Sequence, residues 1–297
     1  MVANSNSQAH EGARDASLRG RWKTRNLPLL AVIIILLTLV IPAVFAEHIA
    51  PHDPFSGSLR NRLKPPSFMG GPAEHPLGTD QQGRDIFSRL IFGSRITIAV
   101  AGAGILIGGL LGTLLGVTAG YFRGWVESVI MRMVDITLSV PIILVAIVVA
   151  VAIGSRFSSV VLIVSLMLWS VYARQIRGET LKWRESEFIS RARVAGASHA
   201  RIIFRHLLPN MVNTLIVLIT LQVGFVIVFE ASLSFLGVGV PRPNPAWGLM
   251  VSDGRQYVMS AWWVAFFPGL WIMLTVLSFN MLGDWLRDRL DPKLRQV

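Results

Sequence analysis

Six long apolar runs constrain the fold of this chain more than any other feature. They cover residues 27–46, 96–119, 127–153, 158–176, 212–238 and 262–283. Each reaches the roughly 20 apolar residues that a helix needs to cross the hydrocarbon core of a bilayer. Charged residues make up 15% of the chain, whereas a typical soluble domain carries about 25%. The sequence therefore predicts an all-α integral membrane protein with six transmembrane helices.

The first apolar run has two interpretations, a signal peptide or a transmembrane helix. Basic residues precede it, and Val44-Phe45-Ala46 would allow cleavage by a signal peptidase. However, the run is 20 residues long, from Leu27 to Ala46, and typical signal cores have about 7–15. We interpret residues 27–46 as an uncleaved first transmembrane helix that follows a polar tail, residues 1–26.

The distribution of Lys and Arg predicts the orientation. With the N-terminus in the cytoplasm, 19 of the 28 basic residues fall on the inner side and nine on the outer side. Cytoplasmic loops carry such an excess, so we expect both termini inside. The basic residues behind the net charge of +11 thus lie mostly in the segments predicted to be cytoplasmic. The positive-inside tendency accounts for them, so we expect no nucleic-acid partner. The expected regions are a cytoplasmic tail (1–26), the first helix (27–46), an extracytoplasmic segment (47–95), a permease core (96–283) with an inner loop (177–211) and an outer loop (239–261), and a cytoplasmic tail (284–297).

The inner loop contains a basic and partly apolar stretch from Glu187 to Asn210. Arranged as a helix, it places Phe188, Ala192 and Ala195 on one stripe. Such a surface element suits either the groove of another protein or the surface of an anionic membrane. The residues alone leave both uses open.

The same stretch contains a predicted break. Glycine inside a helix costs about 1 kcal/mol relative to alanine, so we expect an interruption at Gly196. Ser198 is a suitable N-cap for a second short helix, which we expect to run to Leu208 and to end at Pro209. The stretch is therefore predicted to be a kinked helical hairpin between two transmembrane helices.

Glycines repeat every four residues along the second apolar run. This spacing keeps them near one helix face, where a neighbouring backbone can approach closely. No GxxxxGK[ST] motif occurs in the chain, so the glycines do not indicate a nucleotide site. We expect a helix-packing face made of Gly104, Gly108, Gly112, Gly116 and Gly120.

Three residues inside apolar runs are candidates for a pathway or gate. Asp135 and Pro141 lie in the third run, where the proline frees a backbone carbonyl and favours a kink. Glu230 lies in the fifth run. An ionisable residue inside a membrane is costly, so Glu230 should face protein or water rather than lipid. A structural role in packing remains the alternative for all three.

The segment 47–95 is polar and rich in turns. Closely spaced Gly and Asp residues predict turns that lead into a helix, which Thr79 or Asp80 would cap. Arg84 and Asp85 are placed to form an ion pair. Farther along the chain, Trp247, Trp262 and Trp263 are suited to the outer membrane interface.

Several of these patterns resemble permease subunits of ABC importers. The inner stretch resembles the coupling loop of that family, with Ser190 where many members have Glu and His206 where many have Ile. The residues that match the loop pattern are Ala192, Ala195, Gly196, Leu208 and Pro209.

A second set of motifs resembles one subfamily, the dipeptide, oligopeptide and nickel permeases of the dipeptide-permease C type. Its signature covers His75 to Arg95 and includes Asp80, Gly83, Arg84 and Asp85. Further matches lie at residues 120–141, 230–248 and 283–293. The resemblance thus extends over nearly the whole transmembrane part.

The resemblance implies the fold of type I ABC importer permeases in a bacterial inner membrane. It implies a homologous permease partner, two ATPase subunits that bind ATP and Mg, and an extracytoplasmic binding protein. This chain would bind no cofactor or metal and catalyse no bond-making step. Its inner loop, including Glu187, would dock on the ATPase. The implied substrates are di- or oligopeptides, with nickel complexes or glutathione as the alternative.

Two other classes of protein remain as rivals. A secondary transporter would need ionisable relays in its spans, and Asp135 and Glu230 are the available candidates. A membrane scaffold without transport would need the glycine face but no docking loop. Retention of ATPase subunits during purification would distinguish the importer from both.

Overall fold

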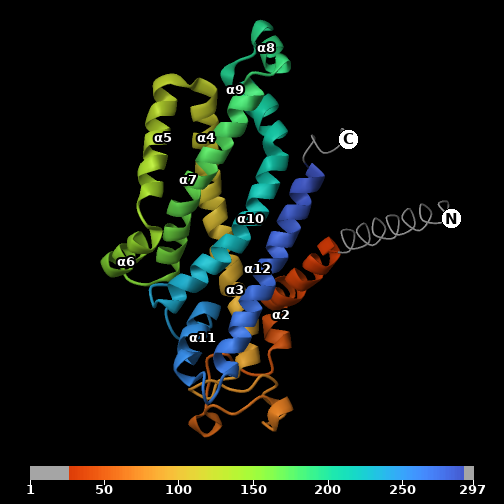
Figure 1. The fold of residues 1–297 in the computed structure, drawn as a ribbon, viewed down its shortest axis with the longest axis vertical. Helices are drawn as coiled ribbons and strands as arrows, with labels where there is room; N and C mark the ends of the chain where they lie inside the picture. Colours follow the sequence, from red (N-terminus) through yellow and green to blue (C-terminus); the bar gives the residue numbers. More distant parts are fainter. Residues whose placement is uncertain (1–26, 291–297) are drawn as a thin grey trace, which may run out of the picture.

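A computed structural model describes residues 27–290 and shows a bundle of long helices (Figure 1). Within these residues, five helices are long and apolar enough to cross a membrane, and a bent pair makes up to six. Within the described residues, the principal helical segments are the first helix (Leu27–Ile49, which includes η1, Leu36–Val40, and α2, Ile41–Ile49), α3 (Ile86–Gly104), η4 (Ile105–Gly109), α4 (Leu110–Phe122), α5 (Gly124–Ser139), α6 (Ile142–Ile153), α7 (Phe157–Arg184), α8 (Glu187–Val194), α9 (His199–Arg201), η5 (Ile202–Leu207), α10 (Leu208–Phe235), α11 (Trp247–Gly254) and α12 (Trp263–Leu290).

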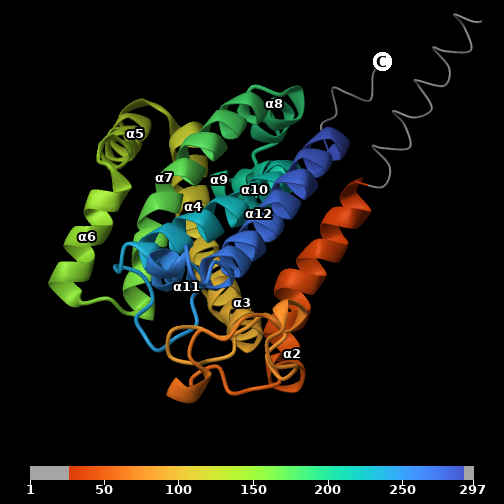
Figure 2. The ribbon, with the colours of Figure 1, turned by 60° about the horizontal axis from the view of Figure 1, so that its bottom comes forward.

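The bundle has two distinct ends. The turn that carries α8 lies at one end, which we call the α8 end, and α11 lies at the other, the α11 end (Figure 1). The connection of residues 50–85 also lies at the α11 end, between the first helix and α3 (Figure 1). In both views α5 and α6 form one edge of the bundle and the first helix lies at the opposite side, with α7 and α10 between them (Figures 1 and 2).

The glycine-rich run packs against α7. A Cβ atom added to Gly108 would lie 2.7 Å from the carbonyl oxygen of Ser165, and one added to Gly116 would lie 2.6 Å from that of Ala173. Such distances leave no room for a side chain, so the two backbones are in direct contact. The other members of the expected face, Gly104, Gly112 and Gly120, also point at α7 residues.

The expected third transmembrane helix, residues 127–153, is broken. The chain bends by 84° between α5 and α6. Val140 is extended, with φ −89° and ψ 127°, and Pro141 precedes the first residue of α6. A residue before proline is driven out of the α region, so the break is sharper than the kink that the proline predicted.

The five long helices all extend beyond the apolar runs that predicted them, at one end or at both. The helix that starts at Ile86 continues to Phe122 over 37 residues, through the π-helical turn η4. The segment His199–Phe235 is also one helix of 37 residues. The boundaries expected at residues 95, 211 and 283 therefore fall inside helices, because polar residues extend each helix past its apolar stretch. The expected tail 1–26 lies outside the described residues, as do residues 291–297 of the expected tail 284–297, whereas residues 284–290 belong to α12.

Candidate coupling loop and membrane site

The turn at the α8 end has the predicted break but not the predicted end. Helix α8 stops at Val194, and Gly196 has a φ of +78°, which favours glycine. The hydroxyl of Ser198 then accepts a hydrogen bond from the backbone N–H of Arg201 and caps α9. Pro209 does not terminate this helix. It lies inside the continuous helix His199–Phe235, directly after the π-helical turn η5. A π-helical turn changes the pattern of backbone hydrogen bonds ahead of the proline, so the helix continues past the missing N–H.

A small apolar cluster holds α8 on the bundle. Ile189 is fully buried and packs with Val117 of α4, Ile176 of α7, and Leu207 and Met211 at the start of α10. The cluster therefore joins α8 to the three helices that enter the bundle beneath it. The sequence pattern missed Ile189, since the expected stripe followed Phe188 and the two alanines.

A polar contact fixes α9, the second short helix of this turn, to α4. The hydroxyl of Tyr121 and Nδ1 of His199 are 2.8 Å apart. The guanidinium of Arg193 lies over the ring of Tyr121, 5.7 Å from its centroid, within the range of a cation–π contact. The sequence did not predict this contact, because Tyr121 and His199 are 78 residues apart.

The tip of the turn is open to its surroundings. Val194 is 91% exposed, and Phe188, Ala195 and Gly196 are exposed as well. Ala192 and Leu208 are partly buried, and Pro209 is exposed. Glu187 pairs with Arg191 over 2.8 Å, and both side chains are more than 80% exposed. The described chain therefore presents an apolar tip that is flanked by basic residues.

The three pathway candidates lie in different environments. Asp135 is exposed on α5 and accepts a hydrogen bond of 2.6 Å from Arg174 of α7. Pro141 marks the break between α5 and α6. Glu230 is 1% exposed, and its Oε1 accepts a hydrogen bond of 2.7 Å from Ser234. Glu230 thus faces protein, as expected, and the structure does not bring the three residues together.

The connection of residues 50–85 ends in a buried polar network. The carboxylate of Asp80 accepts hydrogen bonds from Nε and the backbone N–H of Arg84, over 2.7 and 3.0 Å. Arg89 lies 3.7 Å from the same carboxylate. All three side chains are at most 5% exposed. The expected pair of Arg84 with Asp85 is wrong, because Arg84 turns back to Asp80.

The cap of α3 also differs from the expected one. Asp85, rather than Thr79 or Asp80, is the N-cap, and its Oδ2 accepts hydrogen bonds from the backbone N–H and the hydroxyl of Ser88, both 2.8 Å long. Gly83 has a φ of +71°, which allows the tight turn before this cap.

Two tryptophans expected at the membrane interface are buried instead. The indole N–H of Trp247 donates to the carbonyl of Leu90 over 3.0 Å. That of Trp263 donates to the carbonyl of Thr79 over 3.3 Å. These bonds join α11 and α12 to α3 and to the connection of residues 50–85, so the tryptophans stabilise the α11 end. Trp262 remains exposed.

This architecture defines a class: a multi-pass membrane protein of packed helices with an exposed helical turn at one end. The family model described as "binding-protein-dependent transport system inner membrane component" matches residues 112–296. The chain belongs to this family, whose members are membrane subunits of ABC importers and leave ATP hydrolysis to separate subunits.

Curated relatives agree with the family. The chain is 41% identical over 276 residues to the glutathione transport system permease protein GsiD of Escherichia coli O1:K1, covering 93% of this chain and 89% of the relative. The protein of the same name from Shigella boydii serotype 4 gives the same values. The dipeptide, oligopeptide and nickel type of importer permease is thereby confirmed.

A solved structure supports the fold. The inward-facing MetNI methionine ABC transporter contains a chain that matches 69% of this one and 96% of its own length, with a TM-score of 0.54 and 19% identity. The all-helical importer permease fold and a multi-pass location in the inner membrane are confirmed. Importers of this family work with ATPase subunits, a substrate-binding protein and a permease partner.

Proposed function

We propose that this permease forms, with a homologous permease, the translocation pathway for short peptides. The observation that carries the proposal is the 41% identity to permeases of a glutathione system over 93% of the chain. Glutathione is itself a small peptide, so it is the first candidate within the class of di- and oligopeptides. ATP and Mg bind to the two partner ATPase subunits, and this chain binds neither.

The α8 end is the proposed coupling site, which we place in the cytoplasm. Its exposed apolar tip, Phe188 and Val194, has the character of a surface that fits a groove on another protein. Ala192, Ala195, Gly196, Leu208 and Pro209 belong to the same turn, and Glu187 starts it. Because Ile189 joins α8 to α4, α7 and α10, a movement of the docked turn would be transmitted to those helices as a rigid-body displacement.

The proposed gate is the bend between α5 and α6. Asp135 and Pro141 border this bend, and the ion pair of Asp135 with Arg174 links α5 to α7. A displacement of α7 would therefore act directly on α5. Glu230 has a supporting part in this proposal: its hydrogen bond with Ser234 holds the last turns of α10 beside the loop that leads to α11.

Uptake by the reconstituted complex tests the proposed function. The permease, its partner permease, the ATPase subunits and the binding protein are placed in proteoliposomes with ATP inside. Labelled glutathione, a dipeptide, a pentapeptide and a nickel complex are supplied outside. We expect ATP-dependent uptake of at least one peptide, and uptake of the nickel complex alone would contradict the substrate class. Uptake by the lone chain without ATPase subunits would contradict the ABC mechanism.

A further inference from the structure

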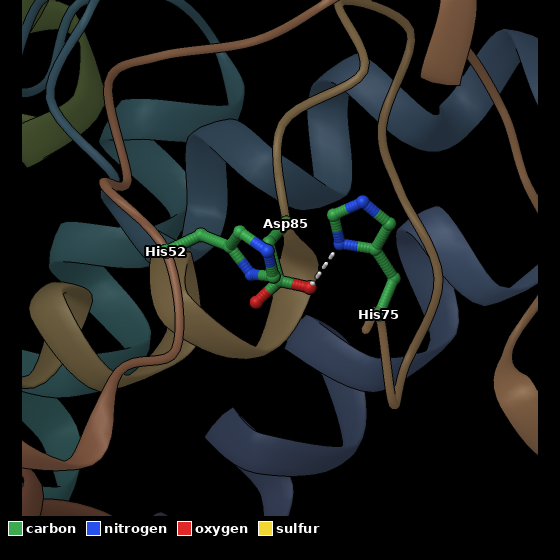
Figure 3. A group of neighbouring side chains, drawn as sticks. All are labelled: His52, His75 and Asp85. Carbon is green, nitrogen blue, oxygen red and sulfur yellow. Dashed lines mark hydrogen bonds and ion pairs between the residues drawn. The ribbon is translucent and has the colours of Figure 1, made fainter. Parts of the chain in front are cut away.

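Three potential metal ligands meet at the α11 end, away from the residues discussed for coupling and gating. His52 and His75 come from the connection of residues 50–85, and Asp85 caps α3 (Figure 3). The nearest ligand atoms of the three side chains all lie within 4.8 Å of one another. His75 and Asp85 are buried and His52 is partly buried.

Asp85 and His75 are already held in position. Nδ1 of His75 lies 3.0 Å from Oδ1 of Asp85. The other carboxylate oxygen of Asp85 accepts both hydrogen bonds from Ser88. Asn61 Nδ2 lies 3.5 Å from Nε2 of His75. Outer partners of this kind orient the ligands of metal sites.

The hydrogen bond between His75 and Asp85 does not account for the position of His52. Its Nδ1 is buried and has no hydrogen-bond partner among the described residues. A buried nitrogen without a hydrogen-bond partner is unfavourable. The backbone N–H of His52 is fixed to the hydroxyl of Ser88 over 3.1 Å, and its ring lies 4.6 Å from the ring of His75. One ring nitrogen of His52 also lies within 4.8 Å of a ligand atom of His75 and of Asp85.

The neighbouring carboxylate does not complete this cluster. Asp53 accepts hydrogen bonds from the backbone N–H of Phe55 and from the hydroxyl of Ser56, over 2.8 and 2.7 Å. The ligand set therefore consists of two imidazoles and one carboxylate.

Two imidazoles and one carboxylate favour zinc over calcium or magnesium. Zn²⁺ binds His nitrogen and Asp oxygen at about 2.0–2.2 Å, and a site with three protein ligands leaves a fourth position for water. Ca²⁺ and Mg²⁺ prefer oxygen ligands alone. Ligands around one tetrahedral Zn²⁺ are about 3.4 Å apart, close to the separation of His75 and Asp85. Among residues 27–290, no hydrogen bond would hold Nδ1 of His52 away from a bound ion.

We propose that His52, His75 and Asp85 bind a divalent transition-metal ion of the zinc class. The ion would tie two points of the connection, 23 residues apart, to the first residue before α3. It would thereby stabilise the α11 end, while its fourth position stays open to water. The site requires neither a peptide substrate nor the coupling role of α8, so it stands or falls separately from the proposed function.

Zinc titration of the purified importer complex tests this site. The complex is stripped with a chelator and titrated with Zn²⁺ by calorimetry, and Co²⁺ absorption reports the coordination. The diagnostic variant is His52→Gln, since the backbone hydrogen bond to Ser88 remains in place. The matched control is His48→Gln, an exposed histidine at the end of the first helix. Thermal unfolding without metal verifies that each variant is folded.

We expect one Zn²⁺ site that His52→Gln weakens by at least about tenfold, since even outer-shell changes cost this much. The control should bind as the original chain does, and excess Mg²⁺ should not compete. Zn²⁺ should raise the unfolding temperature of the original chain and of the control more than that of His52→Gln. Equal binding by His52→Gln and His48→Gln, or no binding by the original chain, would overturn the proposal.

Discussion

The two ends of this permease are held together by different forces. At the α11 end, buried charges and hydrogen bonds fix the connection of residues 50–85 to α3: Asp80 with Arg84, and Asp85 with Ser88 and His75. At the α8 end, one buried isoleucine anchors a short helix, and the ion pair of Glu187 is exposed to solvent. Buried polar contacts depend on geometry much more than exposed ones do.

This contrast indicates different roles for the two ends: the α11 end is rigid, and the turn at the α8 end is free to move with a partner. A polar network that loses one member leaves an unpaired buried charge, so the α11 end tolerates little rearrangement. The turn at the α8 end exposes Val194 and Phe188 and has few internal bonds to break when a partner moves it. The comparison predicts large losses of stability from changes at the α11 end and losses of transport without unfolding from changes at the α8 end.

The largest loss of stability is expected for Asp80→Ala. The substitution leaves Arg84 and Arg89 buried without the carboxylate that pairs with them. Breaking a buried pair by removing one partner costs about 3–5 kcal/mol. Chemical denaturation in detergent micelles, followed by tryptophan fluorescence, measures this loss. A cost below about 1 kcal/mol would show that solvent reaches the network and would remove the contrast between the ends.

A smaller loss is expected for Glu230→Ala. The hydroxyl of Ser234 would lose its acceptor in a buried position, which costs about 1–3 kcal/mol. Glu230→Gln retains an acceptor of nearly the same shape and should lose less than half as much, with uptake near that of the original chain. If Glu230→Gln keeps its stability but abolishes uptake, the carboxylate acts in the pathway itself and is not a structural group.

The change Gly196→Trp should separate transport from stability. Its φ of +78° costs about 1–2 kcal/mol for a residue with a side chain, and the indole would stand on the exposed tip. We expect uptake to fall to background while the permease remains folded, as measured in proteoliposomes and by thermal unfolding.

Gly196→Asn is the control for this variant. Asparagine tolerates positive φ and adds little bulk, so it should keep most of the uptake. Full uptake and unimpaired ATPase binding by Gly196→Trp would refute the docking role of the turn.

Local features of this fold were accessible from the sequence. Apolar length predicted the transmembrane helices, and the glycine spacing indicated the helix face that meets α7. The N-cap at Ser198 and the break at Gly196 were also predicted, because both depend on neighbouring residues in the chain.

Features that depend on distant partners could not be predicted. Arg84 pairs with Asp80 rather than with the adjacent Asp85, because the turn at Gly83 brings the side chains of Asp80 and Arg84 together. His52 and Asp85 are 33 residues apart in the sequence, and no sequence pattern predicts that they lie close together in the fold. The burial of Trp247 and Trp263 depends on carbonyl groups of α3 and of the connection before it, which only the folded chain brings within reach.

The smallest loss of stability is expected for Glu187→Ala, which tests the contribution of the exposed ion pair at the α8 end. Its ion pair with Arg191 is exposed on both sides, and exposed pairs of this spacing contribute about 0.3–0.5 kcal/mol. The free energy of unfolding should therefore barely change, in contrast with that of Asp80→Ala measured under the same conditions. Affinity for the ATPase subunits is the more informative measurement. If removal of this carboxylate weakens ATPase binding strongly while stability is unchanged, Glu187 contacts the partner subunit, and the α8 end is organised by docking rather than by bonds within this chain.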